Sequence, residues 1–330
     1  MIADEQLAAL LRAAAAQPTS GSSDVATLRA AGRARAATRP PGPAMSTTDT
    51  TLAGVPVRVY QPGTSTVIVY LHGGGFVLGD LETHDPQVRR LAAATSATVV
   101  AVDYRRAPEH PWPAAVDDAT AVVTHLAADD THTTMTAASH LAAVSHLAAD
   151  GARVAVAGDS AGGLIAILTA LRLRDEVPLL AQLLVCPNAD PTLSSPSVTE
   201  KGQDWLLDAG TLRDWIAMWL PDPALLGSPS VDPLAADLRG MPPALVVTSE
   251  HDPLRDEGDA YAARLRAAGV PVIHRCEPGL IHNFPSLRQV SPACADAEDR
   301  FLHDAADLLR TSTARFSPQR STAEEEAAQN

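Results

Sequence analysis

Short apolar runs separated by polar, turn-forming residues recur along the chain from Val55 onward. Several runs are apolar throughout rather than alternating, which is typical of strands buried on both faces of a parallel sheet. The runs that we interpret as strands are Val55–Tyr60, Val67–Leu71, Thr98–Val102, Val154–Ala157, Leu179–Val185, Leu245–Thr248 and Val270–Arg275. Strands that alternate with helical stretches predict an α/β fold, with a mostly parallel central sheet flanked by helices.

Helical patterns occupy most of the gaps between these runs. The predicted helices are Met1–Gln17, Asp85–Ala94, Gly162–Arg174, Asp256–Ala268 and a last one from Ser291 to about Arg310. Gly269 suits a helix C-cap, and Ser291-Pro292 supplies an N-cap followed by proline at the first helical position. Residues 18–50 are rich in Ser, Thr, Gly, Pro and Arg, and predict a loosely ordered connection.

This pattern divides the chain into three parts. Residues 1–50 hold the N-terminal helix and linker, residues 51–310 form the main α/β domain, and the polar residues 311–330 predict a disordered tail. One connection inside the main domain, residues 188–233, is too long for a simple loop and carries Trp205, Trp215 and Trp219. It therefore predicts a helical excursion over the sheet.

A six-residue unit occurs in three near-copies within residues 124–150. We interpret it as a small duplication that lengthens a surface helix pair. The alternative is a metal site formed by the histidines of this region, which are His125, His132, His140 and His146. Against a metal site, His140 and His146 are spaced so that they point away from each other on a helix.

The segment Gly158-Asp159-Ser160-Ala161-Gly162 fits the G-x-S-x-G pattern of a nucleophile elbow. It follows an apolar strand and precedes a helix of small residues, so Ser160 would lie on a sharp strand-to-helix turn. A hydroxyl becomes a good nucleophile when a neighbouring base removes its proton. The pattern therefore makes Ser160 the candidate nucleophile, against the alternative of an ordinary turn that contains serine.

His282 is the candidate base, because it follows the last predicted strand, at the sheet edge where ligands gather in open α/β folds. Asp252 follows the preceding strand and is the candidate acid that orients the imidazole. Glu250 lies nearer the end of that strand and remains a rival for this role. The chain order Ser, Asp, His is the α/β-hydrolase order.

The glycine-rich turn His72-Gly73-Gly74-Gly75 follows a predicted strand upstream of the elbow. Backbone N–H groups in such a turn can stabilise negative charge that develops on a reacting oxygen. We predict that Gly74 and Gly75, with Ala161 after the nucleophile, donate to this oxyanion. His72 itself is expected to be an architectural hydrogen-bonding residue.

Composition restricts the partners and the compartment of this 330-residue chain. The net charge of −14 argues against nucleic acid as a partner, because phosphate binding requires clustered basic residues. Three scattered cysteines without C-x-x-C spacing favour buried thiols over a disulfide framework or a zinc site. The chain has no signal-peptide pattern and no apolar run of about 20 residues, so we expect a cytoplasmic protein without a membrane span.

Taken together, the motifs resemble the hormone-sensitive-lipase-like family of α/β-hydrolase esterases. The segments that carry the resemblance are His72–Phe76, Asp103–Ala115, Gly158–Gly163 and Asp252–Gly258, and the match runs from about Gly54 to Phe284. The family usually has Leu at Arg106, often Tyr at Cys186 and usually Gly at Asn283. The last difference could alter the His282 loop and the choice of substrate.

The resemblance implies a serine carboxylesterase that hydrolyses short-chain esters of small molecules without metal or cofactor. It implies a catalytic triad of Ser160, Asp252 and His282, and an oxyanion hole formed by Gly73, Gly74, Gly75 and Ala161. It also implies a cap built from the N-terminal residues and Asn188–Pro233, and it allows a homodimer. Because fold does not fix substrate, a deacetylase or other tailoring enzyme remains an alternative, as does a non-catalytic binding protein.

Overall fold

An eight-stranded sheet in the order β1-β2-β4-β3-β5-β6-β7-β8 forms the centre of the computed structural model, which describes residues 1–16, 24–61, 66–128 and 153–316. The strands are β1 (Ser46–Leu52), β2 (Val55–Gln61), β3 (Thr66–Leu71), β4 (Thr98–Val102), β5 (Arg153–Asp159), β6 (Gln182–Val185), β7 (Ala244–His251) and β8 (Val272–Ile281). The pairs β1–β2 and β2–β4 are antiparallel, and all later pairs are parallel. The predicted α/β fold with a mostly parallel sheet is confirmed.

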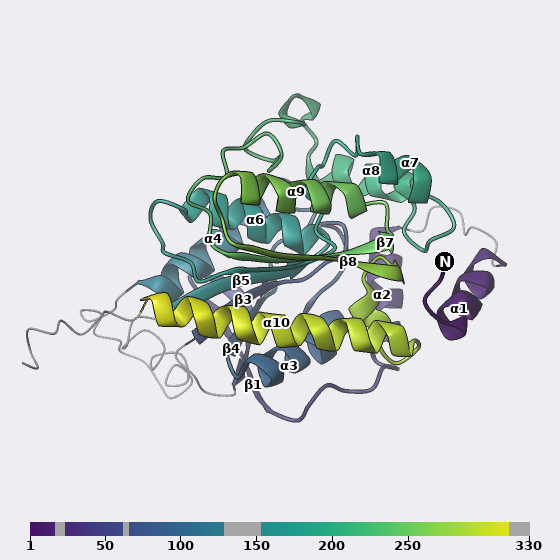
Figure 1. Cartoon of the computed structure of the whole chain (residues 1–330), viewed down its shortest axis with the longest axis horizontal. Helices are drawn as coiled ribbons and strands as arrows, with labels where there is room; N and C mark the ends of the chain where they lie inside the picture. The colour runs from purple at the N-terminus through teal and green to yellow at the C-terminus, as the bar shows by residue number, and fades with distance from the viewer. Residues whose placement is uncertain (17–23, 62–65, 129–152, 317–330) are drawn as a thin grey trace, which may run out of the picture.

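Helices cover both faces of the sheet (Figure 1). On one face lie α4 (Ala114–Ala127), α6 (Ala161–Leu173) and α9 (Arg255–Ala267). On the other face lie α3 (Leu81–Thr95) and the long α10 (Pro292–Phe316). Apolar side chains of the strands pack into two cores, one beneath each helical layer, which explains why the central strands are apolar without alternation.

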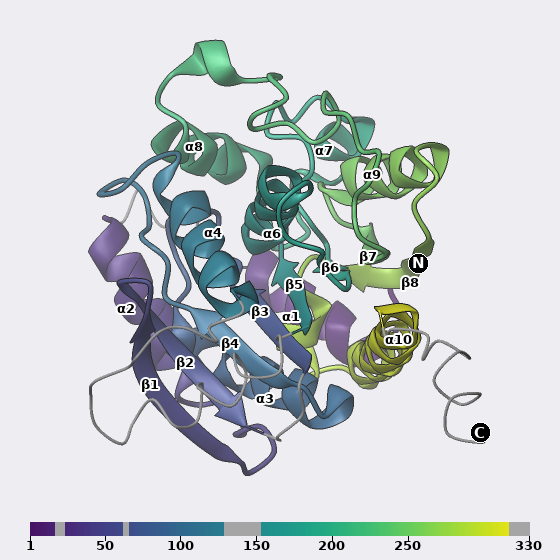
Figure 2. The ribbon, with the colours of Figure 1, turned by 90° about the vertical axis from the view of Figure 1, so that its left-hand side faces the viewer.

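Further elements lie outside these layers. The segment after β6 contains α7 (Pro196–Lys201), α8 (Ala209–Trp219) and the short 3₁₀ helix η1 (Pro223–Leu225), as the predicted helical excursion requires. Figure 2 shows α8 above α4, and α7 between α6 and α9 in this view. At the N-terminus are α1 (Glu5–Ala15) and α2 (Val25–Ala36), and a second 3₁₀ helix, η2 (Phe284–Leu287), precedes α10.

The prediction of a loosely ordered connection over residues 18–50 is wrong for much of its length. Asp24 caps α2 by accepting a hydrogen bond from the Thr27 backbone N–H (2.9 Å). Residues 46–52 form the edge strand β1, which joins β2 through a tight turn in which Ala53 (φ 50°) and Gly54 (φ 83°) are both left-handed. The polar sequence of β1 concealed this strand, since an edge strand needs little apolar surface.

Other boundaries also differ from the prediction. The last helix continues to Phe316, and α4 was not predicted. Most of the histidine-bearing repeat, including His132, His140 and His146, lies outside the described residues. Of its four histidines, His125 lies in the described part. Among the described residues, no helix combines the length and apolar character needed to cross a bilayer.

Candidate active site

Ser160 lies between β5 and α6, in a backbone conformation (φ 53°, ψ −123°) that side-chain-bearing residues rarely adopt. The turn is so tight that its glycines lie directly against other backbone atoms. A Cβ at Gly162 would lie 2.0 Å from the Leu71 carbonyl oxygen, and one at Gly158 would lie 2.4 Å from the Gly162 oxygen. Only glycine allows this approach, which places Ser160 at the N-terminus of α6, where the helix dipole favours negative charge.

The structure brings together the side chains of Ser160, His282 and Asp252. The Ser160 Oγ lies 2.9 Å from the His282 Nε2, and the His282 Nδ1 lies 2.8 Å from the Asp252 Oδ2. The Asp252 side chain is 0 % exposed, and its Oδ1 accepts a hydrogen bond from the Leu254 N–H (2.8 Å). With Nδ1–H donating to the carboxylate, the His282 Nε2 is free to accept the serine proton.

The environment of His282 favours its protonated form. Burial alone would lower the pKa of His282, but the negative charge of Asp252 and its hydrogen bond outweigh burial, so the pKa is raised. The neighbouring Asp252 therefore increases the basicity of the imidazole as well as fixing its orientation.

Glu250, the rival carboxylate, is engaged elsewhere. Its Oε2 accepts a hydrogen bond from the Gly279 backbone N–H (2.7 Å), and its side chain is 40 % exposed. Glu250 thus ties β7 to β8. The carboxylate that reaches His282 is Asp252.

The glycine-rich turn lies beside the elbow, but not all of its N–H groups are free. Gly73 was expected among the oxyanion donors, yet its N–H donates to the Asp159 Oδ1 (3.0 Å), which corrects that assignment. Within the part of the chain that the structure describes, the N–H groups of Gly74, Gly75 and Ala161 make no hydrogen bond to the protein. These three remain the proposed donors.

His72 supports this turn from behind. Burial, followed by the charge of His84, lowers the pKa of His72 to about 3, so its ring is neutral. Its Nδ1 lies 2.9 Å from the Gly73 carbonyl oxygen, and the Tyr104 hydroxyl donates to the His72 carbonyl oxygen (2.7 Å). This is the architectural role expected from the sequence.

Asp159, the residue before Ser160, is a part of the site that sequence reasoning missed. It is buried, and its Oδ1 accepts a hydrogen bond from the Tyr70 hydroxyl (2.6 Å) as well as from Gly73. Burial opposes its ionisation, but the charge and hydrogen bond of His84 and the hydrogen bond of Tyr70 outweigh burial and lower the pKa of Asp159. The G-x-S-x-G pattern allows any residue at the x position before the serine, so the pattern alone does not indicate a role for Asp159.

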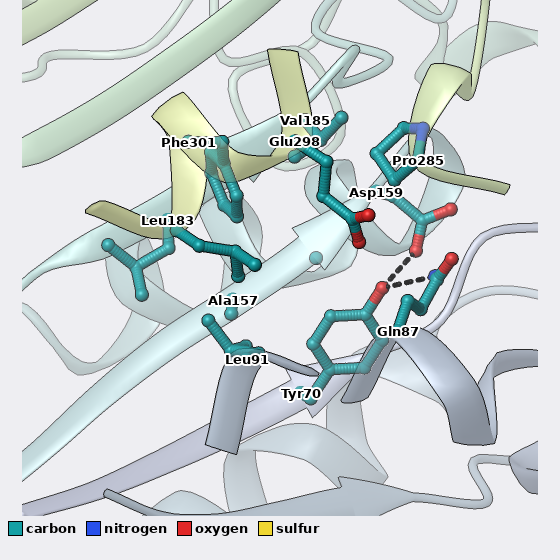
Figure 3. Close-up of a pocket in the computed structure, with 12 residues that line it drawn as sticks. Tyr70, Gln87, Leu91, Ala157, Asp159, Leu183, Val185, Pro285, Glu298 and Phe301 are labelled. Atoms are coloured by element: carbon teal, nitrogen blue, oxygen red, sulfur yellow. Dashed lines mark hydrogen bonds between the residues drawn. The ribbon is translucent and has the colours of Figure 1, made fainter. Parts of the chain in front are cut away.

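Figure 3 shows the far side of this network, where Tyr70 points toward Asp159 and Gln87 in a cavity between β3, β5, α3 and α10. The cavity has a volume of about 30 Å³. That is room for roughly one water molecule, and no residue of the Ser160–His282–Asp252 group lines it. The cavity is therefore not a substrate site.

Aromatic side chains of the segment 188–233 lie against the glycine-rich turn. A Cβ at Gly75 would lie 2.0 Å from the Trp215 ring, and the Trp219 ring stacks on Phe76 with centroids 4.1 Å apart. Trp205 instead stacks on His251 (4.2 Å). Of the three tryptophans in this segment, Trp215 thus contacts the turn that carries the proposed oxyanion donors, and Trp219 contacts Phe76, the residue after that turn.

Cys186, Asp252 and His282 form a group whose ligand atoms all lie within 4.8 Å of one another. The Asp252 and His282 atoms are already paired with each other. Burial, together with the charge of Asp252, raises the pKa of the Cys186 thiol well above its usual range, which disfavours the thiolate that a metal requires. We therefore assign no metal here.

A serine, a histidine and an aspartate in hydrogen-bonded series, at the carboxyl ends of parallel strands, define the class of α/β serine hydrolases. A family model described as "alpha/beta hydrolase fold" matches residues 68–286. The chain therefore belongs to the α/β hydrolase family, and the resemblance to its hormone-sensitive-lipase-like esterases is confirmed.

Similar proteins are named as esterases. Carboxylesterase NlhH of Mycobacterium tuberculosis is 42% identical over 262 residues, which are 76% of this chain and 77% of that protein. An ethyl acetate hydrolase of Pseudomonas putida is 35% identical over 246 residues, 72% of this chain and 73% of that protein. The crystal structure of an esterase from Pyrobaculum calidifontis superposes with a TM-score of 0.81 at 35% identity, covering 93% of this chain and 99% of that chain.

Proposed function

We propose that this protein is a serine carboxylesterase that hydrolyses short-chain carboxylic esters of small molecules. The observation that carries the proposal is the hydrogen-bonded series from the Ser160 Oγ through His282 to the buried Asp252, with 2.9 and 2.8 Å separations. We assign Ser160 as nucleophile, His282 as general base and acid, and Asp252 as the orienting acid.

In the first step, the Ser160 Oγ attacks the ester carbonyl carbon while the His282 Nε2 takes the hydroxyl proton. The carbonyl oxygen becomes an oxyanion, which the N–H groups of Gly74, Gly75 and Ala161 stabilise. The protonated His282 then gives its proton to the leaving alcohol, and the acyl group remains on Ser160.

In the second step, water replaces the alcohol. His282 takes a proton from the water as it attacks the acyl carbon, and then returns a proton to the Ser160 Oγ as the carboxylic acid leaves. No step requires a metal or cofactor, since the base and the N–H donors supply the charge stabilisation.

The proposed preference for short acyl chains rests on the aromatic cover. Trp215 packs on Gly75, whose N–H would bind the carbonyl oxygen, so the Trp215 ring would form a wall of the acyl site. Trp219 and Phe76 stack next to this wall. The name of the Pseudomonas putida relative, an ethyl acetate hydrolase, is consistent with a short acyl group.

The test combines labelling with kinetics. A fluorophosphonate should label wild-type protein at Ser160, and Ser160→Ala should lose both labelling and hydrolysis of p-nitrophenyl acetate while circular dichroism stays unchanged. Ester hydrolysis by Ser160→Ala at more than a trace would exclude Ser160 as nucleophile. Labelling without turnover across esters of increasing acyl length would exclude simple carboxylic esters as substrates.

A further inference from the structure

Glu257 is a buried carboxylic acid with no part in the steps above. It lies in α9, its side chain is 0 % exposed, and a single oxygen, Oε1, accepts three hydrogen bonds. The donors are the Asn188 side-chain amide (2.7 Å) and the backbone N–H groups of Ala189 (2.8 Å) and Asp190 (3.2 Å). Burial, and then the charge of Asp190, raises the pKa of Glu257 well above its usual range.

The turn that Glu257 holds is also attached to the nucleophile. The Asn188 backbone N–H donates to the Ser160 carbonyl oxygen (3.0 Å), and this oxygen also accepts from the Gly163 N–H (2.9 Å). Pro187 packs on the same helix start, since a Cβ at Gly163 would lie 2.8 Å from the Pro187 Cβ. Asn188 therefore holds Ser160 with its backbone and Glu257 with its side chain.

Glu257 is also linked, through the start of α9, to the proposed orienting acid Asp252. α9 begins three residues after Asp252, and the Leu254 N–H links the two by donating to the Asp252 Oδ1 while the Leu254 carbonyl accepts from Gly258. A shift of the turn at Asn188 relative to α9 would thus move Ser160 relative to the His282–Asp252 pair. Both α6 and α9 pack on the same face of the sheet (Figure 1).

We propose that Glu257 is a positioning residue for the reaction. It fixes the elbow that carries Ser160 against the turn that carries Asp252, and it anchors the first residues of the segment 188–233 that covers the site. The inference rests on the proposed function, because it assumes that Ser160 is the nucleophile. The role requires one side-chain oxygen, charged or neutral, that accepts hydrogen bonds from three N–H groups. Glutamine has such an oxygen and alanine does not.

The experiment measures the second-order rate of fluorophosphonate labelling at Ser160, together with kcat and KM for p-nitrophenyl acetate. The temperature is one at which circular dichroism shows every variant folded. Glu257→Ala should label at least tenfold more slowly, with a fall in kcat as well as a rise in KM. Glu257→Gln should stay within about threefold of wild type, because its amide oxygen still accepts the three donors.

A matched control comes from the same helix. The buried Tyr261 hydroxyl, one turn further along α9, donates to the Gln182 Oε1 (2.7 Å) and is not among the donors that Glu257 accepts from at the Asn188 turn. Tyr261→Phe should lower stability while labelling at the wild-type rate. If Glu257→Ala does not fold, Asn188→Ala replaces it, since this change removes one of the three hydrogen bonds and should slow labelling about threefold or more.

The outcomes separate the two proposals. Wild-type protein that does not label at Ser160 contradicts the proposed function. Wild-type protein that labels, alongside Glu257→Ala or Asn188→Ala labelling at the same rate, overturns the role of Glu257 alone. Equal slowing by Glu257→Gln and Glu257→Ala would also overturn it. The pH midpoint of kcat/KM should be unchanged in all these variants, because the His282–Asp252 contact is untouched.

Discussion

Replacing Asp252 by asparagine tests the electrostatic part of the proposed mechanism. The side chain is 0 % exposed, so water cannot substitute for the lost carboxylate. If the amide oxygen keeps the hydrogen bond from Leu254, the amide N–H₂ faces the His282 Nδ1, which must then act as an acceptor. The imidazole proton moves to Nε2, and this tautomer cannot take the proton of Ser160.

The expected loss in kcat is large. A triad carboxylate changed to its amide costs on the order of 10⁴-fold in a serine protease, which serves as the reference here. That factor corresponds to about 5 kcal/mol of transition-state stabilisation. Glu250→Gln should cost no more than about threefold, because its oxygen can still accept from Gly279 and a partly exposed hydrogen bond contributes little.

The pH dependence gives a second readout with a defined sign. His282 must be neutral to act as a base, and its pKa is raised in the folded protein, so kcat/KM should fall as pH drops through a midpoint above about 6.5. In Asp252→Asn, burial still lowers the pKa but the raising charge is gone, so the residual activity should have a lower midpoint. A pH-rate profile with p-nitrophenyl acetate measures both, and an unchanged midpoint or reversed losses for Asp252 and Glu250 would refute the assignment.

Three further changes test the surroundings of the site. Trp215→Ala should shift kcat/KM toward longer p-nitrophenyl esters, by up to about fourfold for each additional methylene that the enlarged site accepts. Gly162→Ala should lower the free energy of unfolding in urea by about 3 kcal/mol, because its Cβ would overlap the Leu71 carbonyl. Tyr70→Phe removes a hydrogen-bond donor from Asp159. The lowered pKa of Asp159 stabilises the folded state above about pH 4, and this stabilisation is lost as the pH falls further. Acid unfolding followed by circular dichroism should therefore begin at a higher pH in this variant.

Each of these changes has a control elsewhere in the chain. Trp205→Ala removes a tryptophan that stacks on His251 rather than on Gly75, so an equal shift in chain-length preference would contradict the role of Trp215. Gly32→Ala has open space for its Cβ and should not destabilise the protein. Tyr60→Phe removes a comparable hydrogen bond to Asp85, and an equal acid shift there would contradict the link to Asp159.

The sequence predicted those parts of the site that depend on strand ends. Ser160 and His282 follow β5 and β8, whose first parts were predicted from apolar runs, and parallel strands bring their carboxyl ends to one edge of the sheet, so contact between them was predictable. The occupied N–H of Gly73 was not predictable. It depends on the Asp159 side chain folding back across the neighbouring strand, which no spacing in the sequence encodes.

The polar N-terminal part of the fold escaped for a different reason. β1 consists of Ser, Thr and Asp up to its last residue, because as an edge strand it needs only backbone pairing with β2. Its register is set by the Ala53–Gly54 turn and by β2, not by an apolar face of its own. The pattern of apolar and polar residues reports the composition of such a strand but not the strand with which it pairs.

The choice between Glu250 and Asp252 depends on sheet register, which the sequence could not supply. In a regular strand, side chains two residues apart share a face, so both carboxylates would point the same way. The pairing of β7 with β8 shifts between Ser249↔Glu277 and His251↔Ile281, so that two extra residues of β8 are accommodated there.

The extra residues include Gly279 (φ 71°), whose N–H meets Glu250 and occupies it. Beyond the irregularity, His251 pairs with Ile281 at the last residue of each strand, and the side chains of the residues that follow, Asp252 and His282, meet at 2.8 Å. Without the two extra residues, His282 would lie about 7 Å further along its strand, beyond hydrogen-bonding reach of Asp252. A bulge beside an active site that re-aims side chains is a recurrent device, and here it assigns one carboxylate to the sheet and the other to the imidazole.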